Sequence, residues 1–189
     1  MYPFASADPP ENTTFSEAFR SATLSTNRGI YPPTSEYSTM NDLLFRLIEL
    51  SGKGYCCSQI MLILGLENQG KENPDLVRAM NGLCMGVASS GGTCGVFSGA
   101  ACLLSLYAGK GADDETENEK LPLMLSALTD WFSETVGGRY GGIQCADIIG
   151  EGAAAPDTGR CGEIMTETYG RVLEILMEND IDPAGVIDE

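Results

Sequence analysis

Histidine is absent from the 189 residues of this chain, and its absence excludes several kinds of catalytic and metal site. There is no Ser-His-Asp triad, no Cys-His nucleophile pair, no His-ligated haem and no histidine-containing zinc site. The usual general base near neutral pH is also missing. Any chemistry must therefore come from carboxylates, backbone dipoles or the seven cysteines.

Positive charge is scarce as well. Lys and Arg number 11 against 27 Asp and Glu, which gives a formal net charge of -16. An acidic surface repels phosphate groups, so nucleic acid and anionic membranes are excluded as partners. Between Arg78 and Lys110 no residue is charged, but the apolar part after Gly91-Gly92 is only about 15 residues, short of the ~20 that span a bilayer. This stretch predicts two buried helices and no membrane insertion.

Cysteine is too sparse for a secreted disulfide scaffold, and an odd number cannot all pair within one chain. The first thirty residues show no basic start followed by an apolar run, so no secretory signal is visible. We therefore expect a cytoplasmic protein, in which thiols are usually kept reduced.

The hydrophobic periodicity predicts an all-α fold, because alternating runs and hairpin turns are missing. We expect a single helical bundle of about five to six helices with an irregular N-terminal arm. The domains are the arm at 1–37, an all-α cysteine-containing redox domain at 38–179 and an acidic C-terminal tail at 180–189. The longer predicted helices lie near residues 38–52, 55–67, 74–88, 94–108, 120–136 and 161–178, and a short helix is predicted at 145–149.

Two interpretations of the arm stay open. Its prolines and polar residues are typical of a flexible segment. Alternatively, it lies across its own domain or a second subunit, anchored by aromatic side chains. In the second case the arm and the apolar helices would favour a homodimer. The aromatic candidates are Phe4, Phe15, Phe19, Tyr31 and Tyr37.

Four cysteines share one local context, in which a glycine-bearing turn precedes a predicted helix start. They are Cys57, Cys94, Cys145 and Cys161. The first turn of a helix exposes unsatisfied N–H groups and the positive end of the dipole. A thiolate there is stabilised, so we expect the pKa of these thiols to fall from about 8.5 toward neutrality or below. If the four helix starts meet, they form a pocket of redox thiols that can also bind a metal.

The neighbouring residues and the other three cysteines allow several roles. The backbone of Gly92, Thr93 and Gly95 around Cys94 is the predicted cofactor contact, because glycine lets a chain approach a ligand closely. Cys56 belongs either to the site or to the core, whereas Cys84 and Cys102 are predicted to be packing residues. Free cysteine often simply fills buried space, and this alternative applies to the main four as well.

Known short motifs do not explain the cysteines. No C-x2-C pair is present, so zinc-ribbon and ferredoxin spacings fail. The segment around Cys94 matches neither a P-loop nor a dinucleotide-binding fingerprint. Any shared site must therefore be assembled by the fold.

The cysteine pattern resembles the C_GCAxxG_C_C family, which is named for it. The matching pieces are Cys57-Ser58-Gln59, the segment from Gly92 to Gly99, the segment from Gln144 to Gly150, and Cys161 before the final helix. The resemblance covers about residues 40–178. There are three departures: Thr93 replaces a glycine before Cys94, Gly99 falls one residue late, and Cys56 is an extra cysteine.

The resemblance implies a redox role and supplies no reaction. The family is associated with anaerobic prokaryotes, and a related domain in split-Soret cytochromes c is linked to an iron–sulfur cluster. Whether the protein is an enzyme is left open, and so is the identity of its redox partner protein.

Three functions remain in view. In the first, Cys57, Cys94, Cys145 and Cys161 bind an iron–sulfur cluster as the metal ligands of an electron carrier. In the second, Cys94 cycles with Cys57 or Cys145 in thiol–disulfide or sulfur-relay chemistry. In the third, the protein is a non-catalytic interaction protein with buried structural thiols.

Overall fold

The computed structural model describes residues 40–150 and 157–184, and within these ranges the chain is helical and contains no strand. The all-α prediction is therefore confirmed. The arm predicted at 1–37, the expected capping residues Ser38 and Thr39, and residues 185–189 of the acidic tail lie outside the described residues.

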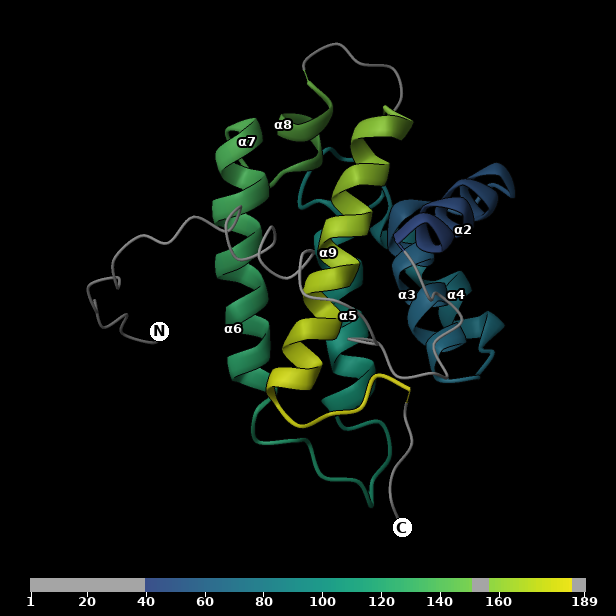
Figure 1. Cartoon of the computed structure of the whole chain (residues 1–189), viewed down its shortest axis with the longest axis vertical. Helices are drawn as coiled ribbons and strands as arrows, with labels where there is room; N and C mark the ends of the chain where they lie inside the picture. The colour runs from purple at the N-terminus through teal and green to yellow at the C-terminus, as the bar shows by residue number, and fades with distance from the viewer. Residues whose placement is uncertain (1–39, 151–156, 185–189) are drawn as a thin grey trace, which may run out of the picture. The chain divides into compact units, whose positions relative to one another are not determined.

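The helices follow one another along the chain, and the longest described connections are residues 84–94 and 109–120 (Figure 1). A 3-10 turn, Asn81–Leu83, follows α4, and a π-turn, Ser133–Gly137, joins α6 to α7. The helices are α2 (Met40–Gly52), α3 (Cys57–Asn68), α4 (Pro74–Met80), α5 (Gly95–Ala108), α6 (Leu121–Phe132), α7 (Gly138–Tyr140), α8 (Cys145–Ile149) and α9 (Thr158–Glu178).

Helix α5 is at the centre of the described domain and packs against α3, α6 and α9 (Figure 1). Its apolar side chains are buried or partly buried, which explains why this stretch of the sequence has no charge. Gly99 permits the close approach of α3, since a Cβ there would lie 3.0 Å from the Ser58 Cα. The buried residues of α5 include Val96, Ala100, Leu103 and Leu104.

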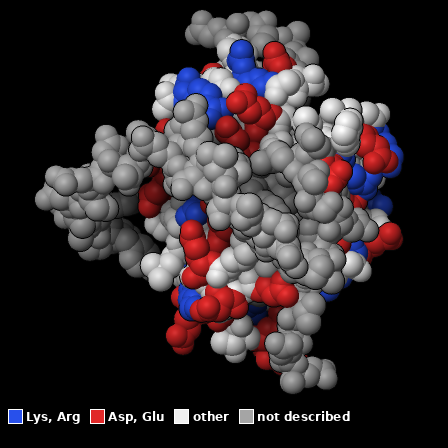
Figure 2. Space-filling view, in the orientation of Figure 1, with Lys and Arg blue, Asp and Glu red and all other residues white. Residues whose placement is uncertain are grey.

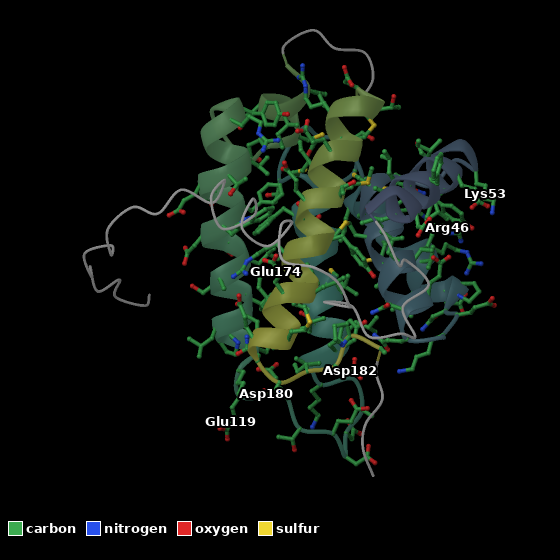
Figure 3. The ribbon with its side chains drawn as sticks, in the orientation of Figure 1. Arg46, Lys53, Glu119, Glu174, Asp180 and Asp182 are labelled. Atoms are coloured by element: carbon green, nitrogen blue, oxygen red, sulfur yellow. A yellow bond between two sulfur atoms is a disulfide. The ribbon has the colours of Figure 1, made fainter. Side chains whose placement is uncertain are left out.

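Helix α2 covers the α3 and α9 side of the domain with one apolar face. Leu43, Leu47 and Leu50 are buried on this face, as the i, i+3, i+4 pattern predicts. Arg46 of α2 and Lys53, which follows α2, both pair with Glu49 (Figure 3), and Arg46 also pairs with Glu67 of α3. Exposed pairs of this kind contribute little stability, so the buried leucines hold α2 in place.

Two predicted helix boundaries are wrong. Helix α4 has the expected Asn73 cap, whose side chain accepts from the Leu76 N–H at 3.0 Å, but α4 ends at Met80 and not near Ala88. Helix α9 begins at Thr158, capped by Asp157, so Cys161 is its fourth residue and not its first.

A left-handed turn replaces the predicted end of α4. Residues 85–89 all have positive φ, including Met85 at 51° and the β-branched Val87 at 62°. Non-glycine residues enter this region at a cost of about 1–2 kcal/mol each. The turn is held by its own main chain: the Ser89 N–H donates to the Cys84 carbonyl at 3.2 Å and the Gly91 N–H donates to the Met85 carbonyl at 3.1 Å. Main-chain hydrogen bonds within the loop therefore hold this segment against the local preference of its non-glycine residues.

The acidic composition is visible on the surface. In Figure 2, Asp and Glu side chains are spread over the described part of the visible face and alternate with a smaller number of Lys and Arg side chains. Several basic residues are engaged in ion pairs, for example Lys120 with Asp180 at 2.9 Å. Within residues 40–150 and 157–184, no helix combines the length and the apolar character that a bilayer crossing requires.

Candidate four-cysteine site

A cavity of about 710 Å³ lies among α2, α3, α5, α8 and α9. Its wall is mainly apolar, and all four cysteines predicted to share a site line it, together with Cys56. The fold therefore brings Cys57, Cys94, Cys145 and Cys161 from separate segments to one place. The apolar part of the wall includes Leu44, Leu47, Ile48, Ile60, Met85, Val96, Ile148, Ile149, Ile164 and Met165.

Cys57 is the first residue of α3 and is half-buried. Backbone N–H groups of Met85, Ser58 and Cys57 itself point to its sulfur, but burial raises the pKa of this thiol above its ordinary value. The sulfur lies against Gly95, because a Cβ at Gly95 would come within 2.5 Å of the Cys57 Sγ. Glycine at this position therefore makes room for the sulfur.

Cys94 is the N-cap of α5 and is only 5% exposed. The pKa of its thiol is raised to about 12, chiefly by burial and to a smaller extent by interaction with Cys57 and Cys145. The N–H groups of Val96 and Phe97 act in the opposite direction but are outweighed. This cysteine is therefore a neutral thiol in the folded protein near neutral pH.

Cys145 opens α8, as predicted, and backbone pairing places it beside the glycine loop before Cys94. The Cys145 N–H donates to the Gly92 carbonyl at 2.6 Å, and an antiparallel bridge joins Thr93 to Gln144. The Cys94 N–H donates in turn to the Ile143 carbonyl at 3.0 Å. Burial raises the pKa of the Cys145 thiol too. These bonds fix two of the four cysteines relative to each other.

The glycine loop acts mainly by holding the site together. The Gly92 N–H donates to the Gly86 carbonyl at 3.1 Å, and Gly92 accepts from Cys145 through its own carbonyl. Gly95 lines the cavity, whereas Gly92 and Thr93 are not part of its wall. The predicted contact of these three residues with a cofactor stays a prediction.

Cys161 approaches the cavity from the first turn of α9. The pKa of its thiol is raised to about 11, chiefly by burial and to a smaller extent by interaction with Cys57 and Cys145. The neighbouring Arg160 anchors the start of α9, since its guanidinium donates to the Ile148 carbonyl at 2.6 Å and lies 5.5 Å from the centre of the Tyr140 ring. The ends of α8 and α9 are thereby tied together.

The prediction that helix starts lower the thiol pKa is wrong for these cysteines. The N–H groups are present at Cys57 and Cys94, but both sulfurs sit in an apolar environment that disfavours the charged form. Here the cost of desolvation exceeds the gain from the backbone dipoles.

Of the other three cysteines, two form a disulfide that was not predicted and one is a core residue as predicted. Cys84 was predicted to be a packing residue, but it forms a disulfide with Cys56, and their Cα atoms lie 6.0 Å apart. Cys102 is free and packs against a small cluster formed by Leu62, Leu66 and Met80, as predicted for a core residue. Sequence reasoning missed the disulfide because Cys84 was placed in the middle of a helix.

The four cysteines surround the cavity and do not converge on one point. Among residues 40–150 and 157–184, no group of three or more His, Cys, Asp or Glu is positioned to hold a metal ion. A site for one zinc ion would need its sulfurs at about 2.3 Å from a common centre. The described cysteines therefore do not form a site for a single ion.

A family model described as "Putative redox-active protein (C_GCAxxG_C_C)" matches residues 55–175. The chain belongs to this family. No curated protein and no solved structure matches it.

The C_GCAxxG_C_C match includes all seven cysteines and runs from the residue before Cys56 to near the end of α9. It leaves out α2 and the N-terminal arm, although α2 contributes Leu44, Leu47 and Ile48 to the cavity. The resemblance inferred from the cysteine pattern is confirmed, and with it the assignment to a redox-active family.

Proposed function

We propose that this protein is an electron carrier that holds an iron–sulfur cluster among Cys57, Cys94, Cys145 and Cys161. The observation that carries the proposal is the shared cavity, into which four separate segments deliver four free thiols. Iron–sulfur clusters are held by cysteine thiolates, and four thiolates are the usual complement. The chain has no histidine that could replace one of them.

The residues fit such a group in three respects. The donor set consists of thiols, the volume of about 710 Å³ leaves room, and backbone N–H groups point to the sulfurs of Cys57 and Cys94. Because a cluster contains several metal atoms, its ligands need not converge on one point, which agrees with the spread of these sulfurs. N–H groups that bond to ligand sulfurs help to set a reduction potential.

When bound, the cluster would supply one-electron storage, and the chain would provide ligation, charge compensation and exclusion of water. The four thiols would each lose a proton on binding, because the thiolate is the ligand. The apolar walls from α2 and α9, including Ile48 and Met165, would keep solvent from the site. Burial of the thiols then disfavours a free thiolate state and favours one compensated by metal cations.

The alternative in which Cys94 itself exchanges with Cys57 or Cys145 receives less support. The thiolate is the nucleophile in such exchange, and a pKa of about 12 leaves almost none of Cys94 in that form near neutral pH.

Anaerobic reconstitution tests the proposal. The full chain is incubated with ferrous iron and sulfide under reducing conditions and desalted, and iron, sulfide and the visible spectrum are measured. We expect retained iron and sulfide in the wild type and a large loss in Cys94→Ser. Cys102→Ser is the matched control, because this free thiol lies outside the cavity. Wild type that retains no iron, or equal losses in the two variants, would contradict the proposal.

A further inference from the structure

Cys56 and Cys84 stand outside the proposed ligand set and are bonded to each other across 28 residues of sequence. They join the N-cap of α3 to the residue that follows the 3-10 turn. We propose that this disulfide is a thiol–disulfide exchange centre, reduced by a low-molecular-weight thiol that reaches Cys56 from the cavity. This function uses two cysteines that are not among the four proposed cluster ligands.

The two sulfurs differ in access. Cys56 is half-buried and lines the cavity, whereas Cys84 is 8% exposed and does not line it. In exchange, the incoming thiolate must reach one sulfur in line with the bond that breaks, and access decides which sulfur is attacked. Attack therefore occurs at Cys56, and Cys84 is the leaving group.

A buried hydroxyl is placed to stabilise the reduced pair. Ser58 has no exposed surface, and its hydroxyl donates to the Met80 carbonyl at 2.8 Å. The same oxygen lies 3.2 Å from the Cys84 Sγ and 3.5 Å from the Cys56 Sγ. Since its proton is engaged with Met80, the oxygen can only accept from the sulfurs. A thiol has a proton to donate and a disulfide has none, so this arrangement favours the dithiol.

The chemical step balances with two equivalents of a thiol. The thiolate of the first equivalent attacks the Cys56 Sγ, the bond between the two cysteines breaks, and Cys84 leaves with the electron pair and takes up a proton. The thiolate of the second equivalent attacks the small molecule's sulfur in the mixed disulfide and releases Cys56, which is then protonated. The protein disulfide is reduced to two thiols, and the two small thiols are oxidised to one disulfide.

The disulfide is coupled to the four-cysteine cavity through the turn that follows it. Met85 comes directly after Cys84, belongs to the cavity wall and directs its N–H to the Cys57 sulfur. The left-handed turn begins at Met85, so the disulfide anchors one end of a costly conformation. Reduction removes this anchor, and we expect the Cys57 thiol to become more accessible.

The first test measures the thiol count of the full chain. Air-oxidised protein, free of metal, is equilibrated anaerobically with glutathione and glutathione disulfide at a series of ratios, alkylated and analysed by peptide mass. We expect five thiols at the oxidising end and seven at the reducing end, with Cys56 and Cys84 as the two that change. A count that rises only in denaturant identifies a structural cross-link and overturns the proposal.

The direction of attack is tested by single substitutions. With glutathione disulfide, Cys84→Ser should form a mixed disulfide at Cys56, whereas Cys56→Ser should leave Cys84 largely unmodified. Alkylation of Cys57 should be faster in Cys84→Ser than in oxidised wild type. Equal modification of the two variants would overturn the assigned leaving group, and an unchanged rate at Cys57 would overturn the coupling to the cavity.

Ser58 is a positioning residue, and its test uses the redox equilibrium. We expect Ser58→Ala to shift the equilibrium toward the disulfide by about three- to tenfold, or about 15–30 mV. The matched control is Ser105→Ala, since the Ser105 hydroxyl also donates to a carbonyl, that of Ala101 at 3.0 Å, but does not line the cavity. The same shift in both variants would overturn the role of Ser58. The iron content of Cys84→Ser, which keeps all four proposed ligands, is measured separately, so failure of one proposal is distinguishable from failure of the other.

Discussion

Alkaline pH should destabilise the folded protein through Cys94. The pKa of this thiol rises from its ordinary 9.0 to about 12 on folding, because the side chain is almost completely buried. A group whose pKa is raised in the folded state contributes stability that is fully present below the unfolded pKa and is lost as pH rises toward the folded pKa. The window therefore runs from about pH 9 to about pH 12.

The magnitude follows from the same two values. The full difference between 9.0 and about 12 corresponds to about 4 kcal/mol at about 1.4 kcal/mol for each tenfold change. Only part of this is lost under conditions that the protein tolerates. At about pH 10, where most unfolded thiols but few folded ones are ionised, the loss from Cys94 is about 1.4 kcal/mol.

The assay is urea unfolding of metal-free protein followed by circular dichroism at about pH 8, 9 and 10, with wild type and Cys94→Ala compared. The variant should be less stable at about pH 8, because it leaves a small cavity, and this deficit should shrink by about 1.4 kcal/mol at about pH 10. Cys102→Ala is the control and should show a smaller change, since Cys102 is half-buried. Parallel stability curves for wild type and Cys94→Ala would refute the reasoning.

Two further predictions concern the scaffold. Gly99→Ala should destabilise the protein by about 1–3 kcal/mol, because the added Cβ would meet the Ser58 Cα. Gly170→Ala in α9 meets nothing within 4 Å and should stabilise the protein by about 0.5–1 kcal/mol. Thermal unfolding measures both changes, and equal shifts in the two variants would contradict the packing argument. Tyr169→Phe removes the buried hydroxyl that donates to the Leu64 carbonyl at 3.1 Å and should cost about 1–2 kcal/mol in urea unfolding, with no loss telling against that hydrogen bond.

The helix starts at three of the four cysteines were predictable because their signal is local. A glycine-bearing turn, a cysteine and an apolar helix follow one another directly in the sequence, so they can be recognised without knowledge of the fold. The structure places Cys57, Cys94 and Cys145 within one residue of a helix start. Cys161 was misplaced by three residues because Asp157, and not Arg160, precedes the helix. An aspartate at this position is a standard N-cap signal, so this boundary could have been found.

The disulfide and the left-handed turn were not predictable in the same way. The apolar pattern of α4 continues through Leu83, Cys84 and Met85. No residue in this segment indicates that the chain reverses there. The reversal is held by a contact with a distant segment, the Met85 N–H with the Cys57 sulfur, and by hydrogen bonds within the loop, such as that from the Gly92 N–H to the Gly86 carbonyl. Positive φ at Val87 shows that these contacts override the local preference of a β-branched residue.

The prediction of lowered thiol pKa values was also wrong because it depended on the assembled fold and not on local sequence. A helix start is visible in sequence, but the depth of burial is a property of the assembled fold, and at Cys94 burial decides the sign of the pKa shift. Four thiolates would add four negative charges to a chain that already has a net charge of -16, inside an apolar cavity. Without a cation the cavity is therefore stable only with protonated thiols. When iron binds, each thiol releases its proton and the sulfur bonds to the metal instead. The affinity for iron should therefore increase as pH rises from neutrality. The resting thiol state and the proposed metal-bound state follow from one feature, the burial of four sulfurs in a place where charge must be compensated.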